Sequence, residues 1–253
     1  MQTTLPCILV TNDDGVDTTE LLALKKTLEE IGQVVVVAPD HNWSAAGHTK
    51  TMHKPLRAME TRLADGSLAY ATNGAPSDCV ALAVLGLLPR RPELVVSGIN
   101  RGANVGYDLT YSGTVAAAME SAIFGLPAMA ISLATFDPPD PEILHYTARF
   151  AVHLAEEILH RGLPGNTFLN VNVPHLPPGE IEGIEITRQG SQTYQETLIT
   201  RQDPRGQTYY WIGGETLRAH AEEETDVGAL ARRRISVTPV HLDLTDYADP
   251  KGF

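Results

Sequence analysis

Short apolar runs alternate with stretches of helical spacing along the first two thirds of the chain, and this alternation limits the fold more than any other feature. The apolar runs occupy residues 7–11, 33–38, 93–97, 128–133 and 168–173. The helical stretches occupy residues 21–28, 78–88, 114–124 and 143–160. Because nearly continuous Val, Ile and Leu runs suit strands that are buried on both faces, the chain is predicted to be α/β. We expect a Rossmann-like, doubly wound, mostly parallel sheet with helices on both faces.

The pattern changes after about residue 177. Shorter alternating stretches follow at residues 184–187, 207–212 and 235–240, with Gly and Pro between them. This pattern predicts a C-terminal antiparallel β extension. We therefore divide one integrated domain into an α/β core (residues 1–177) and a β-rich extension (residues 178–253), an oligomerisation arm or flap. A chain of 253 residues is long enough to bury a full core.

Composition excludes several classes of partner. The formal net charge of −12 argues against binding to a nucleic acid polymer. A small phosphate ester is still allowed, because a bound cation can reverse the local field. The two cysteines, Cys7 and Cys79, lack metal-type spacing and are predicted to be buried thiols. The N-terminus has no basic region and its apolar run ends at Asn12, so we expect a cytoplasmic protein without a membrane partner.

Asp13 and Asp14 directly follow the first apolar run, within the sequence NDDG at residues 12–15. The carboxyl ends of strands in an open α/β sheet form the ligand-binding edge. Two adjacent carboxylates repel each other unless a cation lies between them. The pair therefore suggests a metal site, although the same letters are also common in ordinary turns.

Two further loops follow predicted strands. In residues 38–48, Ser44 is a candidate for the same sheet edge, whereas Trp43 and His48 are better explained by packing and local hydrogen bonding. In residues 95–106, glycines allow close backbone approach, and Asn100 and Asn104 offer neutral oxygen ligands for a hard cation. The glycine spacing does not match a dinucleotide fingerprint, which disfavours a nicotinamide cofactor.

A fourth segment opens an Ala-rich helical stretch with Ser112, Gly113 and Thr114. Free N–H groups and the positive end of the helix dipole make such a start suitable for phosphate. An ordinary Ser N-cap is the simpler alternative. Taken together, the four segments are more specific than any one of them, since each follows a successive predicted strand.

With these motifs in order, the sequence resembles the SurE (survival protein E) nucleotidases from Ile8 to about Tyr247. The resemblance rests on NDDG at residues 12–15, APD at 38–40 with Ser44, VSGIN at 96–100 and SGTVAAA at 112–118. It also includes NVNVP at 170–174, DPRG at 203–206 and LDLTD at 242–246.

The resemblance implies a divalent-metal-dependent phosphatase that acts on nucleoside 5′-monophosphates, with 3′-monophosphates and short polyphosphate as further substrates. It also implies one Mg or Mn ion per subunit and a homodimer or homotetramer. The implied metal ligands are Asp13, Asp14, Ser44 and Asn100, with Asp13 and Asp14 as the catalytic pair. The implied phosphate contacts are Asn104, Ser112, Gly113 and Thr114.

Two segments depart from the family pattern. Ala75 stands where the family usually has Thr, and residues 16–20 (VDTTE) replace a segment in which Pro-Gly is common. The first change removes a hydroxyl, and the second alters the loop after Gly15.

Several alternatives stay open from the sequence. Water attack at phosphorus is the preferred mechanism because both carboxylates are committed to the cation, but an aspartyl-phosphate is the competing route. A nucleotide-binding regulatory module without turnover would keep the same pocket. A flavodoxin-like or nicotinamide-linked redox protein is the other alternative, but the sequence contains neither the glycine fingerprint nor the flavin loop that such a protein needs. The aromatic residues that could stack on a base or simply pack are Tyr107, Tyr111, Tyr209 and Trp211.

Overall fold

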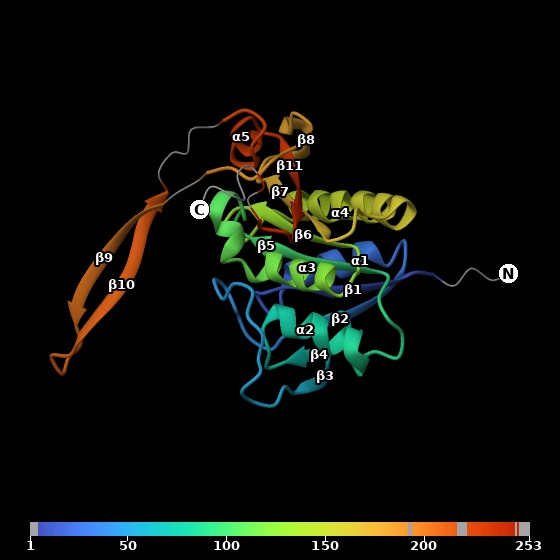
Figure 1. The fold of residues 1–253 in the computed structure, drawn as a ribbon, viewed down its shortest axis with the longest axis horizontal. Coiled ribbons are helices and arrows are strands. Elements are labelled where there is room, and N and C mark those ends of the chain that lie inside the picture. Colours follow the sequence, from blue (N-terminus) through green and yellow to red (C-terminus); the bar gives the residue numbers. More distant parts are fainter. Residues whose placement is uncertain (1–4, 192–193, 217–221, 246, 248–253) are drawn as a thin grey trace.

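The computed structural model describes residues 5–191, 194–216, 222–245 and 247, which form a helix-covered sheet and a separate hairpin (Figure 1). The sheet contains β1 (Cys7–Thr11), β2 (Gln33–Pro39), β3 (Ala58–Arg62), β4 (Leu68–Thr72), β5 (Leu94–Arg101), β6 (Ala128–Ala134), β7 (Thr167–Pro174), β8 (Ile184–Ile186) and β11 (Ile235–His241). The hairpin contains β9 (Tyr194–Gln202) and β10 (Thr208–Thr216).

Five α-helices are present in the described residues. They are α1 (Thr19–Leu28), α2 (Pro76–Leu82), α3 (Gly113–Ile123), α4 (Pro141–Arg161) and α5 (Asp226–Ala231). Short helical turns are η1 (Ala83–Leu87), η2 (Gly106–Thr110) and η3 (Pro178–Glu180).

The sheet has the order β3-β4-β2-β1-β5-β6-β7-β11-β8. The six strands from β4 to β7 in this order are parallel, whereas β3 and β11 pair antiparallel with their inner neighbours. Strand β8 runs parallel to β11. The predicted mostly parallel α/β sheet is therefore confirmed.

Alternate residues of β1 pack against opposite helical layers, which explains its continuous apolar sequence. Ile8 and Val10 belong to a core that includes α1 and α4, and Leu9 belongs to a second core that includes α2 and α3. All three side chains are fully buried. Helices cover both faces of the parallel sheet, as the apolar runs predict.

The sheet order reverses at β1, because the chain passes first to β2 on one side and later to β5 on the other. Such a switch point opens a crevice beyond the carboxyl ends of the strands. The Asp13–Asp14 pair follows β1 and therefore lies at this crevice.

Strands β3, β4 and β9 were not predicted. Their sequences, AMETR, LAYAT and YQETLITRQ, are short or polar and lack a continuous apolar run. Strand β3 is at the sheet edge and mostly exposed, so its pairing with β4 depends on tertiary contact more than on its own hydrophobicity. The helix predicted at residues 78–88 is also different, since α2 begins at Pro76 and gives way to η1 at Ala83.

The C-terminal segment returns to the main sheet. Strand β11 pairs with β7, while the β9–β10 hairpin projects away from the sheet (Figure 1). The division of the chain at residue 177 stays a prediction. Strands from both sides of this residue belong to the same sheet.

Both cysteines are free and buried, as expected, and burial raises the pKa of the Cys79 thiol to about 12.

Candidate active site

A cavity of about 550 Å³ opens at the carboxyl edge of the central strands. Its lining includes five of the predicted site residues, namely Asp13, Ser44, Asn100, Asn104 and Ser112. These residues come from four separate segments of the chain, and the fold brings them together. Of the other predicted residues, Asp14 and Gly113 are next to lining residues in the sequence, and Thr114 is two positions after Ser112.

Asp13 is held by the start of α3. Its carboxylate accepts a hydrogen bond from the Thr114 hydroxyl at 2.6 Å and another from the Thr114 N–H at 3.1 Å. Burial raises the pKa of Asp13, and the hydrogen bonds from Thr114 partly oppose this effect. Gly113 permits the close approach, because a Cβ at this position would lie 2.7 Å from the Cβ of Asp13. Thr114 thus orients a carboxylate in addition to its predicted role.

Asp14 is less enclosed than Asp13. Asn42 donates to its Oδ1 at 3.2 Å. Burial, together with the adjacent Asp13 charge, raises the pKa of Asp14 to about 6, while the charge and main-chain N–H of Arg101 oppose the rise. A cation bound beside the pair would favour its ionised form.

Ser44 belongs to an irregular segment, residues 40–51, that is tied to the site by its main chain. The Trp43 N–H donates to the Asp13 carbonyl at 2.7 Å, and the Gly47 N–H donates to the Tyr111 carbonyl at 2.8 Å. These bonds hold the segment on both sides of Ser44, between the end of β1 and the start of α3.

Two buried carboxylates anchor the far end of the same segment. Glu120 pairs with His48 at 2.8 Å and with Lys50 at 3.0 Å. Asp78 accepts from the Thr51 N–H at 2.9 Å and from its hydroxyl at 2.7 Å. His48 is therefore a hydrogen-bonded loop histidine, as the sequence suggests.

Asn100 reaches the cavity from a bulge in β5. The pairing of β5 with β6 shifts between Gly98 and Asn100. Gly98 has φ +139°, and a Cβ there would lie 2.3 Å from the Ile131 carbonyl oxygen. The Asn100 amide donates to the Gly102 carbonyl at 2.8 Å. Its Oδ1 has no hydrogen-bond partner in the part of the chain that the structure describes and is free to bind a cation.

Asn104 is fixed by a buried amide network that the sequence analysis did not assign to the site. Asn172 accepts from the Asn104 N–H at 2.8 Å, and Ser132 accepts from its side-chain amide at 2.9 Å. Asn170 and Asn172 both donate to the Asn104 carbonyl. A signal for this network is present in the sequence. Asn170 and Asn172 are two positions apart in a mostly apolar strand, so both side chains are on the same face of the sheet.

Ser112 is the N-cap of α3, and its hydroxyl accepts from the Val115 N–H at 3.2 Å. The ordinary cap is thus present. Ser112 also lines the cavity, so the same residue is placed beside any bound anion. Its phosphate contact stays a prediction.

The donor set suits a hard divalent cation. No cluster of three or more His, Cys, Asp or Glu residues is found within the described ranges. The predicted ligands are instead two carboxylates, one hydroxyl and one amide oxygen. Oxygen donors of these types fit Mg or Mn better than a structural zinc.

The candidate aromatic residues separate into two places. Tyr111 lines the cavity together with Phe136, which the sequence analysis did not single out. Tyr209 and Trp211 are on the β9–β10 hairpin. The cavity wall therefore offers two aromatic side chains, and Tyr107 does not line it.

Both departures from the family pattern have a local structural account. The Ala75 N–H donates to Asp78 at 3.0 Å, so the main chain reaches that carboxylate without a hydroxyl at this position. In residues 16–20, the Thr18 hydroxyl donates to the Gly15 carbonyl at 3.1 Å and accepts from Asn12 at 2.9 Å. Thr18 thereby closes the loop that carries the aspartates.

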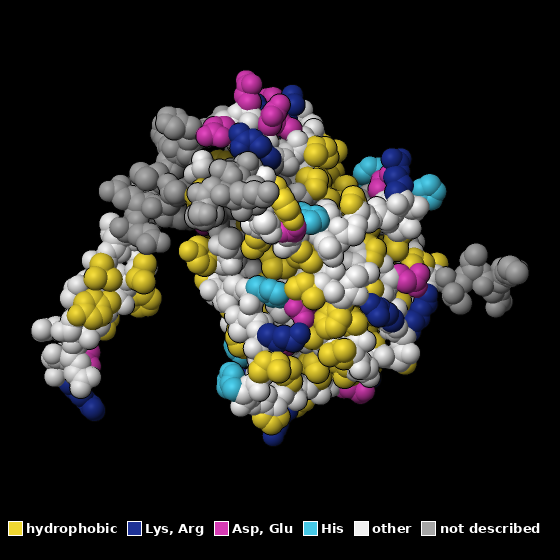
Figure 2. Space-filling view, viewed as in Figure 1, with side chains coloured by type: hydrophobic (Ala, Val, Ile, Leu, Met, Phe, Trp, Pro, Cys, Tyr) yellow, Lys and Arg dark blue, Asp and Glu magenta, His cyan; other side chains and the backbone are white. Residues whose placement is uncertain are grey.

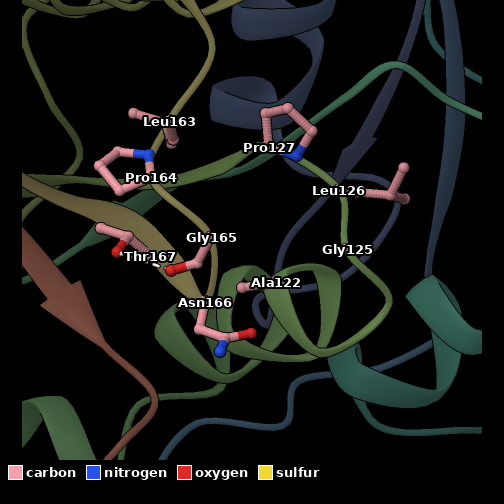
Figure 3. A pocket seen from close by; sticks show the side chains of 9 residues that line it. All are labelled: Ala122, Gly125, Leu126, Pro127, Leu163, Pro164, Gly165, Asn166 and Thr167. Carbon is pink, nitrogen blue, oxygen red and sulfur yellow. Dashed lines mark hydrogen bonds between the residues drawn. The ribbon is translucent and has the colours of Figure 1, made fainter.

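A second, smaller cavity of about 90 Å³ lies before the amino ends of β6 and β7 (Figure 3). Figure 3 shows it lined by proline rings, Leu126, Leu163 and the polar side chains of Asn166 and Thr167. None of its nine lining residues ionises, and it lacks the converging polar groups of the larger cavity. We assign the candidate active site to the larger cavity.

Comparison with known proteins shows the family of the chain. The family model described as "Survival protein SurE" matches residues 8–196. The chain belongs to the SurE family. The predicted resemblance is therefore confirmed, and with it the fold class. Among the helices of the described residues, none combines the length and hydropathy required to cross a bilayer.

SurE relatives align with nearly the whole chain. A protein from Chloroflexus aggregans named 5′-nucleotidase SurE is 52% identical over 241 residues, covering 95% of this chain and 94% of the relative. A protein of the same name from Moorella thermoacetica is 52% identical over 242 residues, covering 95% and 92%. The crystal structure of the SurE protein from Aquifex aeolicus matches with a TM-score of 0.82 and 42% identity, covering 97% of both chains.

Proposed function

We propose that this SurE-family chain is a 5′-nucleotidase, a phosphoric monoester hydrolase that converts nucleoside 5′-monophosphates into nucleoside and phosphate. The observation that carries the proposal is one cavity that joins Asp13, Ser44 and Asn100 to the capped start of α3. Such a site offers oxygen ligands for a cation beside donors for a phosphoryl group. The names of the relatives from Chloroflexus and Moorella support the same activity.

The proposal includes one divalent cation per subunit, Mg or Mn, held by Asp13, Asp14, Ser44 and Asn100. When bound, such an ion would neutralise phosphate charge and lower the pKa of a water molecule. The protein's contribution is to orient the ligands. Thr114 fixes the Asp13 carboxylate, and the bond from Asn100 to Gly102 directs the amide.

The phosphoryl group is proposed to contact Asn104, Ser112, Gly113 and Thr114. Because the hydroxyl and the N–H of Thr114 both donate to Asp13, its contact requires that one of these two bonds be released on binding. Asn104 is held on its main chain and its amide by neighbouring strands, so its geometry needs little reorganisation on binding. These contacts address the phosphate and leave the base unspecified. We therefore extend the proposal to nucleoside 3′-monophosphates and short polyphosphate as secondary substrates.

Water is the proposed nucleophile. Both oxygens of Asp13 already accept hydrogen bonds from Thr114, which favours a ligand role over in-line attack. Trapping of a covalent phospho-enzyme at Asp13 or Asp14 would refute the water route.

A phosphate-release screen tests the function. Purified protein is incubated with nucleoside 5′- and 3′-monophosphates, polyphosphate and p-nitrophenyl phosphate, each with Mg, Mn or EDTA. We expect release from the nucleotides with either metal and none with EDTA. Metal-dependent AMP binding without release would favour the regulatory module instead, and activity that survives EDTA would reject the metal site.

We also propose that the β9–β10 hairpin is an oligomerisation arm in a homodimer or homotetramer. Large apolar side chains are exposed on it, including Leu198, Tyr210, Trp211 and Ile212. Figure 2 shows hydrophobic side chains along the hairpin, apart from the main body. An isolated two-stranded hairpin is marginally stable in water, so a second copy that covers these groups is the economical solution. Light scattering after size exclusion tests this, and a monomer would reject it.

A further inference from the structure

Arg101 is the last residue of β5, directly after the predicted metal ligand Asn100. It lines the larger cavity, and no other lining residue is Lys or Arg. Its side chain is 35% exposed, so the guanidinium can meet a ligand from solvent.

Arg101 forms an ion pair with Glu20. The Arg101 Nε lies 3.4 Å from the Glu20 Oε1, and the Glu20 side chain is only 4% exposed. The Thr19 hydroxyl donates to the other Glu20 oxygen at 3.0 Å. A buried carboxylate is costly without a partner, so Arg101 is strongly retained at this position.

Glu20 lies in the segment, residues 16–20, that departs from the family pattern. The last two residues of the segment, Thr19 and Glu20, are the first two of α1. The positive end of the helix dipole favours an acidic residue such as Glu20 in this first turn. The ion pair between Glu20 and Arg101 therefore connects the segment that departs from the family pattern, residues 16–20, to the edge of the cavity.

Charge balance gives Arg101 a further consequence. Asp13 and Asp14 together neutralise one divalent cation, which leaves the charges of Glu20 and of the lining residue Asp108 to repel a phosphate dianion. Arg101 offsets the Glu20 charge. Since the 3.4 Å contact with Glu20 is made by Nε, the two terminal amino groups can supply planar, paired hydrogen bonds to phosphoryl oxygens.

We propose that Arg101 is a substrate-binding residue that donates to the non-bridging oxygens of the phosphoryl group, and that Glu20 positions it. The proposal rests on the proposed nucleotidase function and deepens it. It concerns binding of a phosphate monoester dianion and involves no covalent step at Arg101.

The test measures binding of inorganic phosphate by calorimetry with Mn present, and kcat and KM for AMP. In R101A we expect phosphate affinity to fall and KM to rise about 10- to 100-fold, the range for lost hydrogen bonds to a charged group. We expect Mn affinity to change less than about 3-fold, because the cation ligands remain. R101K should recover part of the phosphate affinity.

Glu20→Gln tests the positioning role. On its own it should weaken phosphate binding by a smaller factor than R101A, because the loss of the contact that positions Arg101 is offset in part by the removal of a negative charge. In the R101A background, where only the charge effect is left, it should change phosphate affinity by less than about 2-fold. Arg161→Ala removes the same charge from an exposed site at the end of α4 and serves as the control. Circular dichroism melting checks folding, and Arg101→Gln replaces R101A if the latter fails to fold.

Unchanged phosphate affinity and KM in the arginine variants would overturn the assignment of Arg101. An equal effect of Glu20→Gln with and without Arg101 would overturn the positioning role. If the wild-type protein releases no phosphate from any nucleotide, the proposed function fails, whereas the phosphate calorimetry still decides whether Arg101 binds the anion.

Discussion

The candidate active-site edge of the sheet and the β9–β10 hairpin differ in the environment of their side chains. At the edge, buried polar groups such as those of Asp13 and Asn104 find hydrogen-bond partners within the chain. On the hairpin, Trp211 and Ile212 are 63% and 78% exposed. The polar groups of Asp13 and Asn104 are satisfied within one subunit, because a buried polar group without a partner is costly. The exposed apolar groups of the hairpin are those that we propose a second copy of the chain to cover.

The largest effect is expected when one predicted metal ligand at the sheet edge is replaced. Asp14→Asn should lower kcat about 10³-fold or more and weaken Mn binding, since a metal site supplies several kcal/mol of transition-state stabilisation. The melting temperature should stay near that of the wild type because Asp14 is only partly buried. Steady-state kinetics and Mn titration measure the change. Asp203→Asn in the hairpin turn is the matched control, and wild-type activity in the Asp14 variant would remove this residue from the site.

The next effect concerns the close approach of α3 to Asp13. In Gly113→Ala the new Cβ would lie 2.7 Å from the Asp13 Cβ, so the carboxylate must move. We expect turnover to fall about 10- to 100-fold and stability to drop by about 1–3 kcal/mol from overpacking. Urea unfolding and AMP kinetics report both changes.

Gly165→Ala is the control for that variant, because a Cβ at residue 165 meets no atom within 4 Å. Equal behaviour of the two alanine variants would show that the contact between Gly113 and Asp13 is unimportant.

A smaller effect is expected where Glu120 anchors the segment that carries Ser44. Hydrogen bonding from His48, and then from Lys50, lowers the pKa of Glu120 below 4.5. Its contribution to stability is therefore present above pH 4.5 and is lost as the pH falls through the lowered value. Glu120→Gln should reduce the unfolding free energy at pH 7 by about 1–3 kcal/mol.

The difference between Glu120→Gln and wild type should shrink when urea unfolding is repeated below pH 4.5. Glu157→Gln, which breaks an exposed pair with Arg161, should change stability by less than about 1 kcal/mol at either pH. A pH-independent difference for Glu120→Gln would contradict the ion-pair explanation.

The smallest effect on turnover should come from the hairpin. Leu198 and Ile212 are paired across its strands and are both exposed. Replacing both with Ser should reduce the assembly mass in light scattering. Turnover per subunit should stay within about 3-fold, because none of the predicted site residues is on the hairpin. Thr200→Ser is the control. An unchanged mass would argue that another surface holds the subunits together.

The sequence predicted the parallel core well because burial on both faces requires continuous apolar runs, as in β2 and β6. It failed at β3 and β9, whose polar residues form strands only through pairing with a neighbour. The same distinction applies at the site. Asp13 and Asn100 follow recognisable strands, whereas the amide network around Asn104 depends on contacts between distant segments.

By itself, the sequence determined the α/β class and the SurE resemblance, because these depend on local periodicity and on motifs at strand ends. The oxygen-rich ligand set stays a prediction that this resemblance implies. Only the tertiary structure decided that Thr114 fixes Asp13, that Glu120 anchors the Ser44 segment, and that Glu20 faces Arg101. Each of these contacts joins residues that are at least 70 positions apart. Their pairing depends on how helices cross the sheet, which no local pattern encodes.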